Sequence, residues 1–371
     1  MKILIALNHP AHYYLFKFIR NELQKKGHEV KYVIKGKDIL EKILISEEIN
    51  FTKLISRRER KNTKFSILSQ LGIEMIKQDF SLNRFIGSFR PDIMLGTDIS
   101  ISHVGWLEKI PTLIFSEDDI EINKLFCYFT YPFASNIITP EVCNVGYFKK
   151  KQLKYNGYQK LAYLHPHWFK PDINVVRKYF TSDKPYFLIR LVSFTAGHDI
   201  EQKQGGVTIE IVKELLAMLK QKGNVYITSE KELSPELNDY KLLIDLTDIH
   251  HLMFFSDLFI GDSQSMIVEA AMLGTPSVRF NSFVGKISVL NELEDKYNLT
   301  IGINNNNPQL LLKTVENLIN TNNLKDIYQK RREKMLSEKI DVTAFAVWFI
   351  ENYPPSMEIM KDNPDYPDRF R

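Results

Sequence analysis

Residues 257–280 hold the densest group of chemically capable side chains in this sequence of 371 residues. Their order predicts a strand, a tight turn, a helix, a second turn and another strand. Gly261 allows the sharp turn, and Asp262, Ser263 and Ser265 are of types that commonly begin a helix. The first N–H groups of a helix lack intrahelical partners and carry a partial positive charge. This turn is therefore a predicted binding site for an anion such as phosphate.

A carboxylate follows this predicted anion site by about one helical turn. Glu269 lies four residues after Ser265, and helical side chains lean back toward the N-terminus of their helix. A carboxylate is poorly suited to phosphate, whereas it accepts hydrogen bonds well from the two hydroxyls of a ribose. Phosphate donors next to a ribose acceptor predict a nucleoside diphosphate as the ligand. A capped helix with a solvated Glu269 is the alternative.

A second polar group follows the predicted strand at residues 186–192. Arg190 is unusual in the apolar run YFLIRLVSF, because a buried arginine needs an anionic partner. Ser193 and His198 come directly after the strand, at or beyond its carboxyl end. A bound anion and a structural carboxylate are the two partners that the sequence leaves open for Arg190.

The turn after the first predicted strand contains two histidines, His9 and His12. Histidine titrates near neutral pH and can take a proton from a hydroxyl group as that group attacks. His12, at the start of the following helix, is the first choice for a general base. A capping or packing role is the alternative.

Two further strands of the first half end in acidic residues. Asp98 stands in the run LGTDIS, and Glu117 begins the run EDD. Paired carboxylates beside a binding cleft can exchange protons with a substrate. No glycine-rich dinucleotide motif follows the first strand, which argues against a nicotinamide-dependent enzyme.

Short β-rich runs alternate with helical periods along the chain, which predicts βαβ units and parallel sheets. The pattern occurs in residues 1–160 and again in 173–340, so we expect two doubly wound, Rossmann-like α/β domains facing a cleft. Residues 155–172 have the composition of a packed hinge, and a helix at 342–352, within the segment 341–371, is expected to return to the first domain. The predicted strands are Lys2–Leu7, Glu29–Ile34, Phe51–Ile55, Asp92–Leu95, Thr112–Phe115, Asn136–Ile138, Tyr186–Val192, Val225–Thr228, Lys241–Ile244, Asp257–Ile260, Ser277–Phe280 and Leu299–Ile301.

The composition is that of an ordinary globular chain, with 44% hydrophobic and 25% charged residues. No run approaches the roughly 18 apolar residues of a membrane span, and the first residues do not resemble a signal peptide, so we expect a cytoplasmic protein. The first 160 residues hold 25 basic and 17 acidic residues, an excess too small for a nucleic-acid-binding protein. Cys127 and Cys143 are expected to be buried thiols, and no group of residues shows metal-ligand spacing.

The motif GDSxxMxxEAAxLGTP, at residues 261–276, resembles the donor-binding segment of GT-B-fold glycosyltransferases and of the related UDP-N-acetylglucosamine 2-epimerases. With HPAHYYLF near the start and YNGYQKLAYLHP at the hinge, the chain is most similar to a bacterial and archaeal group of GT-B-like proteins. The resemblance implies that Glu269 holds the ribose and that His250 lies where such folds seat the base. The other donor contacts that it implies are Arg190, Ser193, His198, Gly261, Ser263, Gln264, Ser265 and Met266.

The same resemblance bears on the first domain. Inverting GT-B transferases often keep a general base in the turn that holds His12. Asp98 and Glu117 roughly match the positions at which the 2-epimerases keep catalytic carboxylates, and His198 falls in a loop where they keep a histidine. The Arg-Pro-Glu signature of the epimerases is replaced here by the run His9–His12.

These features predict a metal-independent glycosyltransferase that needs no cofactor beyond its substrate. It is expected to move a sugar from a nucleoside-diphosphate donor, most simply a UDP-sugar, to a glycan or lipid-linked acceptor in cell-envelope polysaccharide synthesis. The second domain would bind the donor and the first the acceptor. A UDP-sugar 2-epimerase and a non-catalytic nucleotide-sugar-binding protein are the alternatives.

A basic run in the first domain predicts peripheral contact with an anionic membrane. Arg57, Arg58, Arg60, Lys61 and Lys64 precede a helical stretch with apolar positions. A basic segment next to an amphipathic helix suits the surface of anionic lipid, where a lipid-linked acceptor is found. A solvated loop followed by a core helix is the alternative.

Overall fold

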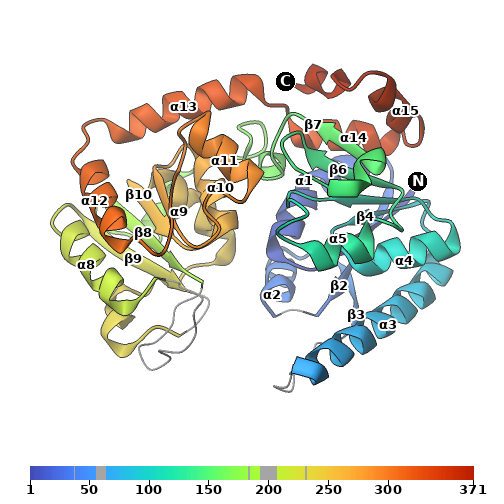
Figure 1. Cartoon of the computed structure of the whole chain (residues 1–371), viewed down its shortest axis with the longest axis horizontal. Helices are drawn as coiled ribbons and strands as arrows, with labels where there is room; N and C mark the ends of the chain where they lie inside the picture. Colours follow the sequence, from blue (N-terminus) through green and yellow to red (C-terminus); the bar gives the residue numbers. More distant parts are fainter. Residues whose placement is uncertain (37, 56–63, 183, 193–206, 230–231) are drawn as a thin grey trace. The chain divides into compact units, whose positions relative to one another are not determined.

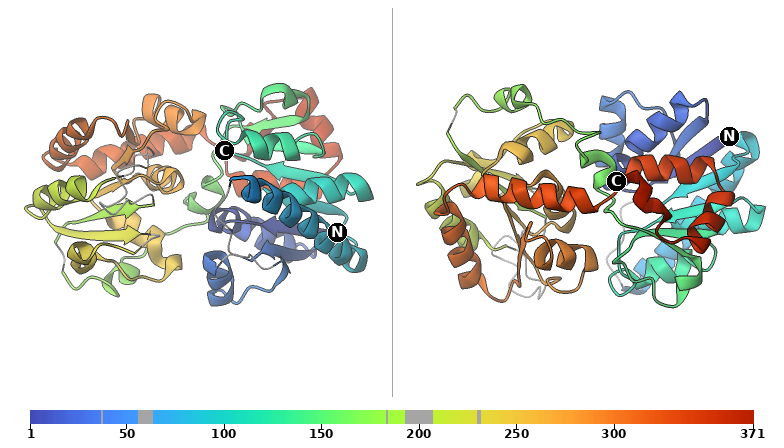
Figure 2. Two further views of the ribbon diagram at one scale, coloured as in Figure 1. Left: turned by 60° about the horizontal axis from the view of Figure 1, so that its bottom comes forward. Right: turned by 90° about the horizontal axis from the view of Figure 1, so that it is seen from above.

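The chain divides into two units, drawn in Figure 1 from a computed structural model. The structure describes residues 1–371 except 37, 56–63, 183, 193–206 and 230–231, and describes only the backbone of residues 38 and 64–71. Unit 1 comprises Met1–Tyr163 and Lys339–Arg371, and unit 2 comprises Leu164–Glu338. Each unit holds one parallel sheet between layers of helices, as the two views of Figure 2 also show. The predicted fold class, two Rossmann-like α/β units, is confirmed.

Seven parallel strands form the sheet of unit 1, in the order β3-β2-β1-β4-β5-β6-β7. The direction of winding reverses between β1 and β4, which is where doubly wound folds bind ligands. β4, β5 and β6 are buried along their whole length, because helices cover both faces of the sheet. The strands are β1 (Lys2–Leu7), β2 (Glu29–Lys35), β3 (Phe51–Ile55), β4 (Ile93–Gly96), β5 (Thr112–Phe115), β6 (Asn136–Pro140) and β7 (Gln152–Tyr155).

The helices of unit 1 form two layers. α3, α4 and α5 pack on one face around a buried cluster that includes Met94, Ile114 and Ile137. α14 packs against α1, which confirms that the last strong helix returns to the first domain. The helices, with η denoting short 3-10 turns, are α1 (Pro10–Lys25), α2 (Asp38–Ser46), α3 (Lys64–Phe89), α4 (Ile99–Glu108), α5 (Lys124–Thr130), η1 (Gly146–Lys151), α6 (Leu161–Leu164, at the boundary), α14 (Val342–Glu351), α15 (Pro355–Asp362) and η4 (Tyr366–Phe370).

His103 ties α3, α4 and α5 together. Its Nδ1 lies 3.0 Å from Oδ2 of Asp79 on α3, and its Nε2 lies 2.8 Å from the carbonyl oxygen of Phe129 on α5. Both ring nitrogens thus face acceptors, which only the protonated ring can satisfy with two donors. The hydrogen bond to Asp79 accordingly raises the pKa of His103 above its ordinary value, although partial burial opposes the shift.

We expect these two hydrogen bonds of His103 to make the stability of unit 1 depend on pH. The unfolded His103 titrates near pH 6.5, about the ordinary value, and the folded residue titrates above it. The contribution of protonated His103 to the free energy of unfolding is therefore complete below about pH 6.5, and it is lost as the pH rises through the pKa of the folded protein. Urea unfolding across this range should show a falling free energy of unfolding in the parent and a flatter dependence in His103→Asn. An unchanged slope in the variant would contradict the assignment.

Five parallel strands form the sheet of unit 2, in the order β12-β11-β10-β8-β9. Here the winding reverses between β8 and β10, so the loops that leave these two strands flank the switch point. The strands are β8 (Tyr186–Leu191), β9 (Asn224–Ser229), β10 (Leu258–Gly261), β11 (Ser277–Phe280) and β12 (Ile301–Ile303).

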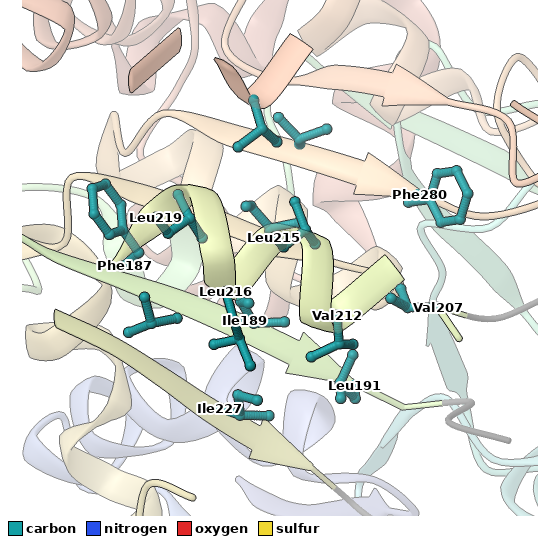
Figure 3. Close-up of a cluster of buried hydrophobic side chains, with 14 of the residues drawn as sticks. Phe187, Ile189, Leu191, Val207, Val212, Leu215, Leu216, Leu219, Ile227 and Phe280 are labelled. Atoms are coloured by element: carbon teal, nitrogen blue, oxygen red, sulfur yellow. The ribbon is translucent and has the colours of Figure 1, made fainter. Parts of the chain in front are cut away.

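Figure 3 shows the core on one face of this sheet. Val212, Leu215 and Leu219, spaced three and four residues apart on α8, pack over Ile189 of β8 and Ile227 of β9. α12 adds to the same cluster through buried leucine and valine side chains. The helices of unit 2 are α7 (Ile173–Arg177), α8 (Ile209–Leu219), η2 (Pro235–Tyr240), η3 (Leu246–Asp248), α9 (Ile249–Phe255), α10 (Gln264–Leu273), α11 (Ser288–Asp295), α12 (Pro308–Ile319) and α13 (Leu324–Glu338).

Two expectations about strands differ from the structure. Residues 241–244 form no strand of the sheet, because only Lys241 makes a bridge, to Ile227, and Leu243 is 76% exposed. β7, at the edge of the unit 1 sheet, was not predicted: its short alternating sequence follows three lysines and lacks a β-rich run.

Among the described residues, no helix is both long and apolar enough to cross a membrane. The predicted basic run falls outside the described residues from Arg57 to Lys61, and only the backbone of Lys64 is described.

Candidate functional site

The turn between β10 and α10 is held tightly to its neighbours at the carboxyl edge of the unit 2 sheet. A Cβ at Gly261 would lie 2.8 Å from the carbonyl oxygen of Arg190 on β8, so only glycine allows this close approach. The Asp262 carboxylate accepts a hydrogen bond from the Val192 N–H at 2.8 Å. The Asn281 side chain donates to the Asp262 carbonyl at 3.1 Å. The ends of β8 and β11 thereby fix the turn from both sides.

The predicted helix begins at this turn. Ser263 is the N-cap of α10, and its hydroxyl accepts from the Met266 N–H at 3.4 Å. Gln264 and Ser265 form the first turn, and this segment is half-buried rather than covered. Gly274 ends α10 in the left-handed region, with φ of 68°. The local structure therefore has the form that was expected of an anion site, a capped helix start after a parallel strand.

Glu269 is less accessible than the sequence suggested. It is only 6% exposed, and its Oε2 lies 3.5 Å from Nε2 of His250, on α9. His250 is itself buried and packs edge-to-face against Phe169, with ring centroids 6.2 Å apart. The structure thus brings together two predicted donor-site residues whose contact the sequence did not indicate. A histidine at this distance can help to orient the carboxylate.

Arg190 and Arg279 flank the glycine of the turn. Both pair in register with Gly261, from β8 and β11 respectively, so their side chains start from the same face of the sheet. Arg190 is half-buried. Arg279, which was not predicted, is fully buried and lies 2.7 Å from a carboxylate oxygen of Glu294 on α11, which fills the space beside Gly302. Burial raises the pKa of Glu294 and lowers that of Arg279, and the attraction within the pair opposes both shifts.

In unit 1, His12 lies in a hydrogen-bonded turn at the carboxyl end of β1. The Thr97 hydroxyl is 2.5 Å from Nδ1 and 2.8 Å from Nε2, and the Asn8 N–H donates to Nδ1 at 3.3 Å. Since Nδ1 accepts from Asn8, the proton of the neutral ring belongs on Nε2. His9 rather than His12 caps α1, with its Nδ1 3.2 Å from the Ala11 N–H.

Asp98 is buried, and both oxygens of its carboxylate accept hydrogen bonds. Its Oδ1 caps α4 by accepting from the N–H groups of Ser100 at 2.8 Å and Ile101 at 3.3 Å. Its Oδ2 accepts from the side-chain amides of Gln78, at 2.8 Å, and Asn8. Four donors hold this carboxylate in one orientation, and Asn8 connects it to the turn of His12.

Glu117, at the end of the neighbouring strand β5, has a cationic partner. Its Oε2 lies 2.5 Å from Nζ of Lys160, and its Oε1 accepts from the Gln159 N–H at 2.7 Å. Desolvation raises the pKa of the adjacent Asp118, the negative charges of Glu117 and Asp119 add to the shift, and Lys160 opposes it. This strand end thus places a carboxyl group with a raised pKa, that of Asp118, next to Glu117.

The three predicted residues of unit 1 follow β1, β4 and β5, which are neighbours in the sheet, so they share its carboxyl edge. Of the predicted residues of unit 2, Ser193 and His198 lie outside the described residues. Sequence reasoning missed Asn8, Thr97 and Lys160. Asn8 and Thr97 are polar residues directly after predicted strands, and this position could have identified them. Lys160 lies in the hinge segment, where no sequence pattern connects it to Glu117.

Solved structures with a similar fold cover nearly the whole chain. The UDP-GlcNAc 2-epimerase of Neisseria meningitidis, bound to UDP-GlcNAc, is 16% identical with a TM-score of 0.61 over 91% of this chain and 99% of its own. The S. aureus MnaA–UDP structure is 14% identical with a TM-score of 0.67 over 96% and 97%. The Streptomyces sp. SF2575 glycosyltransferase SsfS6 is 12% identical with a TM-score of 0.58 over 95% and 100%. At these identities the likeness establishes the fold alone, which is GT-B-like and has two Rossmann-like units.

No curated protein sequence matches the chain. A sequence family does match, over residues 1–353. The chain therefore belongs to the family described as "Protein of unknown function (DUF354)".

Proposed function

We propose that the protein is a glycosyltransferase that takes its sugar from a nucleoside-diphosphate donor bound at the carboxyl edge of the unit 2 sheet. The observation that carries the proposal is Glu269, a buried carboxylate oriented by His250 behind the capped start of α10. The helix start supplies N–H groups and partial positive charge for the diphosphate, and Glu269 accepts from the ribose hydroxyls. The names of similar structures, which include UDP and UDP-GlcNAc complexes, support UDP as the nucleotide.

The proposed reaction is a displacement at the anomeric carbon of the sugar. An acceptor hydroxyl forms the new bond while the bond to the diphosphate oxygen breaks. The charge that develops on the leaving diphosphate is stabilised by the start of α10 and by Arg190. His12 takes the proton of the acceptor hydroxyl on Nδ1, the nitrogen that carries no proton, in place of the 3.3 Å contact from the Asn8 N–H. The Thr97 hydroxyl can stay bonded to the ring, because a hydroxyl both donates and accepts.

We further propose that the acceptor is a glycan or a lipid-linked glycan of the cell envelope and that the enzyme works in the cytoplasm, where UDP-sugars are made. The reaction uses no metal in this proposal, since the helix start and arginine supply the positive charge.

A UDP-sugar 2-epimerase is the second candidate, favoured by the carboxyl groups at the ends of β4 and β5. Asp98 and Glu117 follow adjacent strands, and the raised pKa of Asp118 gives this edge a group able to hold a proton nearer neutral pH. Proton removal and return at a sugar carbon needs such groups.

Incubation with UDP-GlcNAc separates the candidates, with proton NMR following the sugar and UDP release. A transferase consumes the donor only when an oligosaccharide or lipid-linked acceptor is present. An epimerase changes the sugar in the absence of any acceptor. A protein that binds UDP-GlcNAc in calorimetry and never converts it would contradict both enzymatic proposals.

The first test of the donor site is Glu269→Ala. We expect UDP to bind about 1–3 kcal/mol more weakly, because a charge-assisted hydrogen bond to the ribose is lost. Calorimetric titration measures the effect, and thermal unfolding checks that the buried site still folds. Glu316→Ala, an exposed glutamate on α12, is the matched control. Equal UDP affinity in Glu269→Ala and the parent would remove Glu269 from the site.

A further inference from the structure

Exposed apolar side chains gather on the outer face of α3, α4 and α5 in unit 1. On α3 they recur every three to four residues, so they form a stripe along one side of the helix. Single exposed apolar residues are common, whereas a patch shared by three adjacent helices indicates an interaction surface. The α3–α5 face comprises Ile73 (52% exposed), Ile76 (67%), Phe80 (74%), Trp106 (64%), Leu107 (62%), Leu125 (67%), Tyr128 (50%) and Phe129 (46%).

Direct contacts make the α3–α5 face continuous. The ring of His103 bonds to Asp79, next to Phe80, and to the backbone of Phe129, so the three helices meet at this residue. Phe133 extends the aromatic surface, with ring centroids 4.9 Å from His103 and 5.7 Å from Trp106. Figure 1 shows α3, α4 and α5 together on one side of the sheet of unit 1.

The charged groups around this surface are mainly basic. Lys77 and Arg84 are exposed on α3, and Lys109 and Lys124 are exposed at the ends of α4 and α5. Exposed acidic side chains on or beside these helices include Glu108 at the end of α4 and Glu121 three residues before α5. The four basic side chains outnumber Glu108 and Glu121, so the charge around the apolar side chains has a positive excess.

Cations and aromatic rings also line a hollow beside Trp106. The hollow has a volume of about 410 Å³, and its lining includes Trp106, Phe133, Lys109 and Lys151. Lys151 is anchored there by donating to the carbonyl oxygens of residues 132 and 134, at 2.6 and 2.8 Å. An apolar wall beside ammonium groups matches an anionic lipid, which presents a phosphate above its hydrocarbon.

We propose that the α3–α5 face docks on an anionic lipid bilayer. Tryptophan, tyrosine and lysine suit the boundary between headgroups and hydrocarbon, where apolar bodies are buried and polar tips stay in water. The surface potential of anionic lipid attracts the basic side chains. A second copy fits less well, because a two-fold contact joins the same surface of both copies and would bring their basic side chains close together. This inference goes beyond the proposed reaction and is tested without donor or acceptor.

Vesicle sedimentation of the full chain tests the docking. The probes are vesicles of phosphatidylcholine alone and of equal parts phosphatidylcholine and phosphatidylglycerol. We expect binding to the anionic vesicles, loss of binding as salt rises, and little binding to the neutral ones. The apolar variant, Ile76→Ser with Phe80→Ser and Leu125→Ser, and the charge variant, Lys77→Gln with Arg84→Gln and Lys124→Gln, should each bind at least about tenfold more weakly.

Control variants carry two substitutions each, at similarly exposed residues elsewhere. Ile45→Ser with Leu243→Ser is the apolar control, and Lys222→Gln with Lys313→Gln is the charge control. Both should bind vesicles like the parent. A parent that stays in the supernatant with anionic vesicles at low salt overturns the proposal, as does equal loss of binding in the controls. If the apolar variant instead converts a dimer to a monomer in analytical ultracentrifugation and no vesicle binding occurs, the face joins two copies.

Discussion

His12→Ala is expected to lower turnover about 10²–10⁴-fold while leaving the affinity for the donor unchanged. The variant removes the group that is proposed to take the proton of the acceptor hydroxyl. Donor binding should persist, because every donor contact in the proposal comes from unit 2. Turnover is followed by UDP release in the presence of acceptor, and donor affinity by calorimetry.

His12→Gln distinguishes a base from a hydrogen-bond donor at the same place. Glutamine can donate a hydrogen bond from near the Nε2 position but cannot take a proton. If His12 acts as a base, His12→Ala and His12→Gln should therefore both lose activity. Full activity of His12→Gln would assign His12 a donating role, consistent with a ring whose Nδ1 accepts from Asn8. His28→Ala, at the opposite edge of the same sheet, is the matched control and should keep its activity. If Glu117→Gln or Asp98→Asn abolishes a reaction that needs no acceptor, the epimerase is the correct assignment.

Glu294→Ala is expected to destabilise unit 2 by about 3–5 kcal/mol. Arg279 is fully buried, and Glu294 faces its guanidinium at 2.7 Å. Removing the carboxylate leaves a buried positive charge without its counter-charge, whereas removing both charges together costs far less. The double variant Arg279→Met with Glu294→Leu should therefore recover most of the lost stability.

Urea unfolding measures these differences. Glu236→Ala is the matched control, because Glu236 pairs with Lys213 at 2.7 Å on the surface, where such pairs contribute about 0–1 kcal/mol. If Glu294→Ala lowers the free energy of unfolding no more than Glu236→Ala does, the buried pair does not stabilise the fold. A double variant less stable than Glu294→Ala would indicate that packing, rather than charge, dominates at Arg279.

Most of the fold could be predicted from the sequence, because most of its strands and helices are marked by local residue patterns. The strands β1, β4 and β10 are almost entirely apolar runs in parallel sheets, and each precedes a helix with a clear start. Where burial is weak, the local signal fails. The run at 241–244 looked like a strand but leaves Leu243 exposed, and the edge strand β7 alternates too briefly to be recognised.

The candidate site was accessible only in part, because its contacts join distant residues. Gly261 and Ser263 could be assigned from adjacent positions. The bonds from Gln78 and Asn8 to Asp98 span 20 and 90 residues and depend on how α3 and β1 lie beside β4. The burial of Glu269 against His250 likewise depends on the packing of α9 on α10, which no local pattern encodes.

Unit 1 is built from two stretches of chain, one before and one after unit 2 in the sequence. This order along the chain limits the order in which the two units can fold during synthesis. Unit 2 is continuous, so it can close as soon as its last helix leaves the ribosome. The partner of α1, the apolar helix α14, emerges only afterwards. Until then α1 lacks the helix that packs against it in the complete protein. We therefore expect nascent chains that end near residue 338 to contain a protease-resistant second unit and an unfinished first unit that depends on chaperones.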